Sequence, residues 1–268
     1  TRGLVYIHPY DDPQIIAGQG TVALEMLADA PELDMLVVPV GGGGLIAGMA
    51  TAARATRPGI EIVGVEAALY PAMYQVLRGM LPMAGGATIA EGIAVKQPGE
   101  ITQEIVRRLV SDVVLVSEPA LEEAVLTLLE IEKTVVEGAG AAGLAAVMSD
   151  KKRFKGKRVG IVLSGGNIDS RLLSSILMRG LVRSGRLVRI RVDISDAPGL
   201  LARVAQVIGD AGGNIVEVYH QRLFHDVPLK MAELDIVVET RDPEHVDAIL
   251  RQLKTRGMVA TLLSTMTG

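Results

Sequence analysis

The sequence predicts an α/β protein in two parts: a parallel sheet covered by helices, followed by a smaller βαββαβ unit. Up to about residue 182, short and nearly continuous apolar runs alternate with helical patterns, as expected for strands buried on both faces of a parallel sheet. The 30 glycines follow no period, which suits many tight strand-to-helix turns. A length of 268 residues also favours two domains over one.

In the first part, strands and helices are expected to alternate, which is typical of the α/β class. The apolar runs that predict strands lie at 4–7, 36–40, 61–65, 113–116 and 159–163. Apolar residues at helical spacing predict helices at roughly 20–30, 45–56, 71–79, 100–110, 119–132, 139–149 and 170–182.

The pattern changes after a basic stretch at 183–191. Strands are then predicted at 187–194, 214–223, 229–239 and 258–264, with helices at 200–210 and 243–255. This βαββαβ order is the ferredoxin-like split arrangement, and its strands alternate apolar and polar residues, as in a sheet with one open face. We therefore predict one domain at 1–183 and a second at 187–268.

Composition excludes several classes of function. A net charge of −4 gives no general attraction to nucleic acids or anionic membranes. The absence of cysteine excludes disulfides, thiolate zinc sites and cysteine nucleophiles. No apolar run is long enough to span a bilayer, and the sequence starts without a signal-peptide pattern. A cytoplasmic location is therefore expected.

Four consecutive glycines, Gly41, Gly42, Gly43 and Gly44, join a predicted strand to a predicted helix. Unhindered backbone N–H groups and a helix N-terminus together attract an anion. The segment lacks the lysine and hydroxyl residue of a Walker A loop, and it lacks G-x-G-x-x-G spacing. We predict a phosphate site here; the alternative is a tight turn that packs the helix closely on the strand.

A second glycine turn, which begins at Ser164, follows the predicted strand at 159–163. The carboxyl ends of neighbouring strands in an open parallel sheet share a crevice. The two loops are therefore expected to form one pocket with the Ser164 hydroxyl at its floor. The alternative is that this serine only caps the following helix.

Four motifs carry a specific resemblance: "HPYDDPQIIAGQGTVALE" at 8–25, "VPVGGGGLIAG" at 38–48, "EGIAV" at 91–95 and "LSGGNID" at 163–169. In order and spacing this part resembles threonine ammonia-lyases, pyridoxal-phosphate enzymes with the fold of the tryptophan-synthase β subunit (fold type II). The remainder resembles an ACT domain, through "SDAPGLLARV" at 195–204 and "GGNI" at 212–215.

The resemblance implies that L-threonine is converted to 2-oxobutanoate and ammonia in amino-acid metabolism, on the route to isoleucine. It implies that the N–H groups of Gly41–Gly44 and Leu45 bind the cofactor phosphate. Gly92 is expected to place backbone beside the cofactor ring, and Ser164 is expected to meet the pyridine nitrogen. A second reading is a serine dehydratase or racemase of the same fold.

The resemblance also implies a lysine that binds the cofactor covalently, upstream of the glycine loop. None of the forty residues before Gly41 is a lysine, and neither Lys96 nor Lys133 stands in the expected motif. The chain is therefore expected to be a partial catalytic domain that contains no catalytic residue and is inactive alone. A further alternative is a subunit that only binds amino acids or assembles oligomers.

Related enzymes carry a cation site whose first ligand corresponds to Glu66. A further oxygen can come from the Tyr70 carbonyl, but Ala72 stands where an aspartate is expected. Because a hard cation needs several oxygen ligands, no metal is predicted.

The ACT resemblance implies an effector site for a small amino acid, with isoleucine or valine as the expected class. Its residues are expected in the loop after the first strand of this domain and across an interface with a second copy, in a homo-oligomer. The predicted effector-binding residues are Asp196, Ala197, Pro198, Gly199, Leu200 and Asn214.

Overall fold

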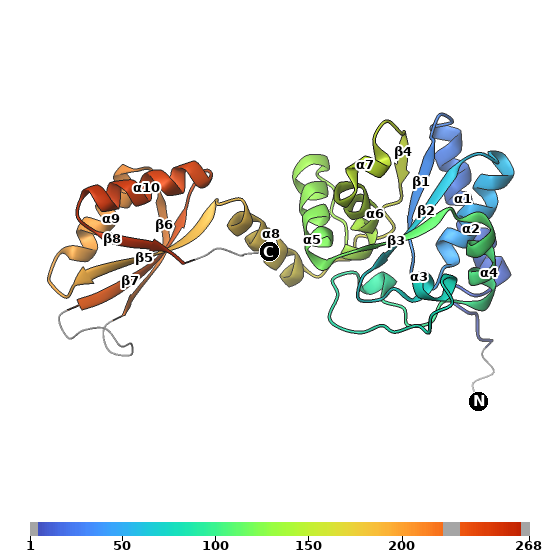
Figure 1. The fold of residues 1–268 in the computed structure, drawn as a ribbon, viewed down its shortest axis with the longest axis horizontal. Coiled ribbons are helices and arrows are strands. Elements are labelled where there is room, and N and C mark those ends of the chain that lie inside the picture. Colours follow the sequence, from blue (N-terminus) through green and yellow to red (C-terminus); the bar gives the residue numbers. More distant parts are fainter. Residues whose placement is uncertain (1–4, 222–230, 264–268) are drawn as a thin grey trace. The chain divides into compact units, whose positions relative to one another are not determined.

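The structure, a computed structural model, describes residues 5–221 and 231–263 (Figure 1). It divides into two compact units, Thr1–Ser170 and Arg171–Gly268. The helix α8 (Ser170–Arg183) thereby falls almost entirely in the second unit. The domain limits at 183 and 187 follow the change of sequence pattern and stay a prediction.

A parallel sheet of four strands forms the centre of the first unit, in the order β3-β2-β1-β4. Its strands are β1 (Met35–Pro39), β2 (Glu61–Ala67), β3 (Asp112–Val116) and β4 (Val159–Ile161). Every residue of β1 is buried, because this strand lies between two others and under helices on both faces. The prediction of a parallel-sheet α/β core is confirmed.

Helices cover the two faces of this sheet (Figure 1). Those before β3 are α1 (Pro13–Asp29), α2 (Gly44–Thr56), α3 (Ala72–Leu77), the 3-10 turn η1 (Glu91–Ile93) and α4 (Glu100–Leu109). Those after β3 are α5 (Glu118–Thr127), the π-helical turn η2 (Leu128–Glu132), α6 (Gly138–Ser149) and α7 (Lys151–Phe154). The face that carries Leu36 and Val38 packs on α1 and α2. On the other face Gly143 of α6 lies close to Val37 and Ile161.

Local sequence explains where several of these helices begin. Asp12 precedes α1, and its Oδ1 accepts hydrogen bonds from the N–H groups of Gln14 and Ile15. Pro13 occupies the first helical position, where no N–H is needed. Ser117 caps α5 in the same way through the N–H of Ala120.

The strand predicted at 4–7 is wrong for the residues that the structure describes. Val5, Tyr6 and Ile7 form no strand, and their side chains are exposed. Residue 4 lies outside the described residues. An apolar run becomes a strand only where a neighbouring strand pairs with it, and β3 and β4 form the two edges of this sheet.

The second unit holds an antiparallel sheet with the order β6-β7-β5-β8. Its elements after α8 are β5 (Leu187–Ser195), α9 (Leu200–Asp210), β6 (Asn214–Gln221), β7 (Met231–Glu239), α10 (Pro243–Thr255) and β8 (Val259–Leu262). They confirm the predicted βαββαβ order. The predicted strand residues 222–223, 229–230 and 264 lie outside the described residues.

Alternation along the strands gives this sheet its two faces. Ile190 and Val192 of β5 and Leu234 of β7 belong to the buried core that α9 and α10 complete. The intervening residues, among them Arg191 of β5 and Asp235 of β7, lie on the other face. On this face Arg191 pairs with Asp235, its Nε 2.7 Å from Oδ1.

Candidate functional site

The glycine loop leads from the end of β1 into α2. Gly43 precedes the helix with φ of 98°, in the left-handed region that side chains disfavour. A Cβ on Gly43 would also lie 2.7 Å from the Thr102 hydroxyl oxygen and 2.8 Å from Cε of Met73. Glycine is therefore required at Gly43 both for its backbone conformation and for the close approach of its neighbours.

Thr102, near the start of α4, holds the glycine loop through hydrogen bonds of its hydroxyl. Its side chain is buried, and its hydroxyl lies 2.7 Å from the Gly42 carbonyl oxygen and 3.0 Å from that of Gly99. The Gly99 N–H also donates to the Gly42 carbonyl at 3.1 Å. These bonds direct the Gly42 carbonyl toward α4, so that it does not face an anion at the loop.

The segment before α1 covers the loop from another side. The Tyr10 ring lies so close to Gly42 that a Cβ there would be 2.3 Å from ring atoms. The Tyr10 hydroxyl donates to the Gln97 carbonyl at 3.1 Å. Next to it, the Asp11 carboxylate accepts N–H bonds from the first turn of α4, including that of Thr102 at 3.2 Å.

A cavity of about 350 Å³ opens above the loop. Its lining comes from the ends of β1 and β4, the turn η1, the start of α6 and the segment before α1, and consists of Pro9, Tyr10, Pro39, Gly41, Gly42, Gly43, Gly44, Leu45, Gly92, Ile93, Val95, Glu137, Ala139 and Ser164. All seven residues predicted to bind the cofactor are among them. The structure thus brings them together, and their role in binding stays a prediction.

Glu137 is a lining residue that the sequence reasoning did not single out. It directly precedes α6 without capping it, and its N–H donates to the Gly165 carbonyl at 3.1 Å. A Cβ on Gly165 would lie 2.2 Å from Oε1 of Glu137, and a Cβ on Gly92 would lie 3.2 Å from it. The carboxylate therefore lies between the two glycine turns, beside Ser164.

The lining fits a flat, phosphorylated pyridine cofactor. The loop can offer backbone N–H groups and the N-terminus of α2 to a phosphate, because four residues there carry no side chain. Glycine at Gly92 leaves room for a ring, and Ser164 supplies a hydroxyl for a ring nitrogen. Neither candidate lysine lines the cavity, and both Lys96 and Lys133 are exposed.

Glu66, which corresponds to the cation ligand, instead stabilises the start of α3. It is buried in β2, and its two carboxylate oxygens accept N–H bonds from Met73 and Tyr74, each at 2.8 Å. Burial raises the pKa of Glu66 to about 7, and the two hydrogen bonds oppose that rise. The described residues contain no group of three or more histidine, aspartate or glutamate side chains placed to hold a metal.

The predicted effector loop borders a groove of about 460 Å³ in the second unit. Gly199 precedes α9 with φ of 85°, which favours glycine. The groove is lined by Asp193, Ile194, Ser195, Leu200, Arg203, Val204, Gln206, Val207, Arg256, Gly257 and Met258. Of the predicted effector residues Leu200 lines it, while Asp196, Ala197, Pro198 and Gly199 form the adjoining loop.

Asn214 lies at the other end of the same sheet. Its Nδ2 donates to Oε2 of Glu239 at 2.7 Å, and Glu239 pairs with Leu187, the first residue of β5. The effector loop follows Ser195, the last residue of β5, so the two lie roughly 25 Å apart along the strand. Within one chain Asn214 does not meet the loop, and its predicted role requires a second copy.

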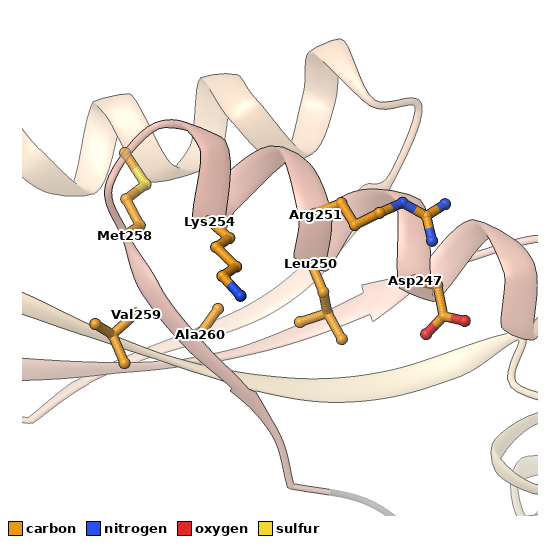
Figure 2. Close-up of a pocket in the computed structure, with 7 residues that line it drawn as sticks. All are labelled: Asp247, Leu250, Arg251, Lys254, Met258, Val259 and Ala260. Carbon is orange, nitrogen blue, oxygen red and sulfur yellow. The ribbon is translucent and has the colours of Figure 1, made fainter.

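A second groove of the same unit runs between α10 and the edge strand β8 (Figure 2). Lys254 points from the helix toward Ala260 of the strand, and Leu250 points toward the sheet; the Arg251 side chain extends along the helix, and Asp247 lies nearer the N-terminus of α10. None of the predicted effector residues lines it. In the part of the chain that the structure describes, no helix has the length and apolar character needed to cross a membrane.

This chain is similar in sequence and in structure to several known amino-acid lyases and racemases. The L-threonine ammonia-lyase of Thermotoga maritima is 44% identical over 257 residues, which cover 95% of this chain and 64% of that protein. The crystal structure of the T.th. threonine deaminase superposes with a TM-score of 0.58 at 42% identity, covering 61% of this chain and 62% of that one. The structure of maize serine racemase superposes with a TM-score of 0.60 at 38% identity, and the match covers 67% of this chain and 56% of that one.

The chain thus spans less than two thirds of the length of these relatives. Family models match in two places: the ACT domain at residues 188–257 and the pyridoxal-phosphate dependent enzyme at residues 1–165. The second match contains the parallel sheet, the glycine loop and every residue that lines the cavity. This chain belongs to the family of pyridoxal-phosphate dependent enzymes and carries an ACT domain after its cofactor-binding unit.

Proposed function

We propose that this chain forms the phosphate-binding side of the active site of a threonine ammonia-lyase, which converts L-threonine to 2-oxobutanoate and ammonia. The observation that carries the proposal is the cavity above the glycine loop, where the seven predicted cofactor residues meet. The 44% identity to an L-threonine ammonia-lyase supports the choice of substrate.

Pyridoxal phosphate, when bound, supplies an electron-withdrawing ring that weakens the bonds at the amino-acid carbon attached to it. The chain's own residues bind and orient that ring. The N–H groups of Gly41–Gly44 and Leu45 hold the phosphate, and Gly92 leaves one face of the ring free of side chains. Ser164 meets the ring nitrogen with its hydroxyl, and Tyr10 fixes the loop from the outside.

We also propose that these 268 residues alone do not deaminate threonine. The reaction needs an amine that binds the cofactor covalently and moves a proton. Among the described residues that line the cavity there is no lysine. Lys133, which directly follows η2, instead directs its Nζ to the carbonyl of Glu130.

The test combines binding with activity. The purified chain should bind pyridoxine 5′-phosphate, and Gly43→Val, which adds a side chain where Thr102 and Met73 leave no room, should lose that binding. The product of the complete reading frame that contains this sequence should release 2-oxobutanoate from L-threonine. Absence of ligand binding by the chain, or of 2-oxobutanoate from that product, would count against the proposal.

The similarity to maize serine racemase favours a second candidate, a serine-directed enzyme of the same fold. The same assay distinguishes them, with L-serine as substrate and with pyruvate and D-serine as measured products. A preference for L-serine over L-threonine in kcat/KM supports the second candidate. Ligand binding without turnover of either amino acid supports a non-catalytic subunit.

For the ACT domain we propose regulation by isoleucine or valine in a homo-oligomer. The groove beside the effector loop supports an aliphatic amino acid, because Leu200 and Met258 offer apolar surface and Arg203 offers a cation for a carboxylate. Arg203→Gln should weaken isoleucine binding measured by calorimetry. Arg251→Gln, in the groove between α10 and β8, is the matched control and should leave it unchanged.

If Arg203→Gln binds isoleucine as tightly as the unchanged chain does, this groove is not the site. Sedimentation velocity with and without isoleucine tests the oligomer. The cytoplasmic location expected from the sequence stays a prediction.

A further inference from the structure

The bend at residues 8–11, directly before α1, is held by the imidazole of its first residue. Nδ1 of His8 accepts the N–H of Asp11 at 2.8 Å and that of Tyr10 at 3.3 Å. The His8 ring also meets the Tyr10 ring edge-on, with 4.5 Å between the two centroids. Pro9 lies between them and has no N–H of its own to bond. The imidazole thus fixes the backbone that carries the next two side chains, although His8 itself lies outside the lining of the cofactor cavity.

The first of these side chains, that of Tyr10, packs directly on the glycine loop. A Cβ on Gly42 would collide with the Tyr10 ring, and a Cβ on Gly44 would lie 3.0 Å from the Tyr10 Cα. Tyr10 therefore covers the loop at two of its four glycines. If Tyr10 moved away, both of these glycines would be uncovered and the loop would be free to change conformation.

The second side chain, that of Asp11, reaches the loop through α4. Its carboxylate accepts three N–H bonds from the first turn of this helix, from Glu100, Ile101 and Thr102, at 2.9, 3.0 and 3.2 Å. A negative charge at a helix N-terminus is stabilising. The Thr102 hydroxyl in turn donates to the Gly42 carbonyl at 2.7 Å. The position of Asp11 therefore determines where α4 holds the loop.

Both routes from the imidazole end at Gly42. We propose that His8 is a positioning residue for the phosphate site: its unprotonated Nδ1 holds Tyr10 and Asp11 in place, and these keep the glycine loop in the shape that binds the anion. This inference rests on the proposed cofactor site and deepens it, because it names a residue that acts on the phosphate only through its neighbours.

The role depends on the protonation state of the imidazole. A neutral imidazole has one acceptor nitrogen and a protonated one has none, and imidazole is the side chain that ordinarily changes charge between about pH 5 and 8. The other titratable groups around His8 are Tyr6, whose ring lies edge-on with 5.9 Å between centroids, Tyr10, and the carboxylates of Asp11 and Glu100, which border the same pocket of about 380 Å³. Carboxylates and phenols ordinarily titrate outside this range.

The experiment measures the affinity for pyridoxine 5′-phosphate, which lacks an aldehyde and so forms no covalent bond with surface lysines. At neutral pH, His8→Ala removes the acceptor and should weaken binding about fivefold, the effect of one net hydrogen bond. His8→Asn should bind within about twofold of the unchanged chain, because an asparagine Oδ1 accepts N–H groups from the residues that follow it in a turn. His220→Ala, at an exposed position of the second unit, is the matched control and should leave the affinity unchanged.

Equal affinities of the unchanged chain and His8→Ala, or an equally weak His8→Asn, overturn the proposal but leave the cofactor site intact. Failure of the unchanged chain to bind the ligand removes both. If His8→Ala does not fold, the pH profile supplies the test. From about pH 7.5 to about pH 5.5 the affinity of the unchanged chain should fall about threefold more than that of His8→Asn. Equal falls in the two proteins overturn the proposal, since the titration of the ligand itself is common to both.

Discussion

The hydroxyl of Thr102 lies 2.7 Å from the carbonyl oxygen of Gly42, although 60 residues separate them in the chain. This bond holds the first turn of α4 against the glycine loop and turns one carbonyl dipole away from the cavity. A carbonyl that instead faced the loop would repel a phosphate. The shape of the proposed anion site therefore depends on a residue that does not line the cavity.

Thr102→Val should weaken ligand binding without abolishing it. Valine keeps the shape of the side chain, while the Gly42 carbonyl keeps the bond from the Gly99 N–H and loses the one from the hydroxyl. One net hydrogen bond contributes about 1 kcal/mol, so the affinity for pyridoxine 5′-phosphate should fall about fivefold. Fluorescence titration measures it, and Thr102→Ser, which keeps the hydroxyl, should restore most of the affinity.

The contact between Tyr10 and Gly42 can be tested as a pair. Gly42→Ala places a Cβ 2.3 Å from the Tyr10 ring, so the ring must move, at a cost of about 1–3 kcal/mol in the free energy of unfolding. In a Tyr10→Ala background the same change should cost much less. Urea denaturation of the four proteins gives the coupling energy; additive effects would show that the two residues are not in contact in solution.

Glu66 predicts a pH dependence of the stability of the first unit. Its pKa is raised from 4.5 to about 7 in the folded state. The folded protein thus binds the proton more tightly than the unfolded chain, so this contribution is complete below about pH 4.5 and is lost as pH rises through about 7. The free energy of unfolding should fall by at most about 3 kcal/mol over this range.

Glu66→Gln should remove this pH dependence. At low pH the protonated Glu66 carboxyl, like an amide, has one good acceptor oxygen, so the substitution should cost less than about 1 kcal/mol there. Four of the five tyrosines, namely Tyr6, Tyr10, Tyr70 and Tyr74, lie in the first unit, and the chain has no tryptophan. Tyrosine fluorescence during urea unfolding therefore reports on this unit. The exposed Glu123→Gln should behave like the unchanged chain at every pH.

In the ACT domain the lowered pKa of Asp235 predicts a pH dependence of stability with the opposite sign to that of Glu66. Asp235 is fully buried between Arg189 and Arg191, and hydrogen bonds from Arg191 and then Arg189 lower its pKa below 3.8, against the effect of burial. The stability it contributes is present above about pH 4 and is lost as pH falls through the lowered pKa.

Asp235→Asn should destabilise the domain by about 2 kcal/mol at neutral pH, less than for a fully buried pair because both arginines are partly exposed. Circular dichroism during urea unfolding measures it. Asp247→Asn, at an exposed position on α10, should change the free energy of unfolding by less than about 0.5 kcal/mol. Equal effects of the two substitutions would contradict the assigned role of the ion pair.

Much of the fold was predictable because its signals are local. Alternation along β5 and helical spacing in α9 and α10 depend on residues a few positions apart, and the predicted helices at 200–210 and 243–255 have the observed bounds. The apolar run at 4–7 gave the same kind of signal but forms no strand in the described residues. Pairing depends on a partner strand, which a single run does not specify.

The residues of the candidate site likewise divide into those that local sequence predicts and those that it does not. The glycine loop and Ser164 were predictable because glycines at the carboxyl end of a buried strand are visible in the sequence. Tyr10, Thr102 and Glu137 were not, because packing brings them to the loop from distant parts of the chain. Thr102 lies 60 residues from Gly42, and Tyr10 bonds to Gln97 across 87 residues. No spacing rule connects positions so far apart.

The proposed phosphate site at the glycine loop would recognise its anion through main-chain groups alone, and this limits how evolution can change it. Main-chain N–H groups are the same in every amino acid, so a mutation at Gly43 cannot tune the recognition; it can only obstruct the site with a side chain. Adaptation to new substrates must instead act on residues such as Glu137 and on the parts of the pocket that other segments supply. A fold of this kind can retain one cofactor over long divergence while the reaction it catalyses changes.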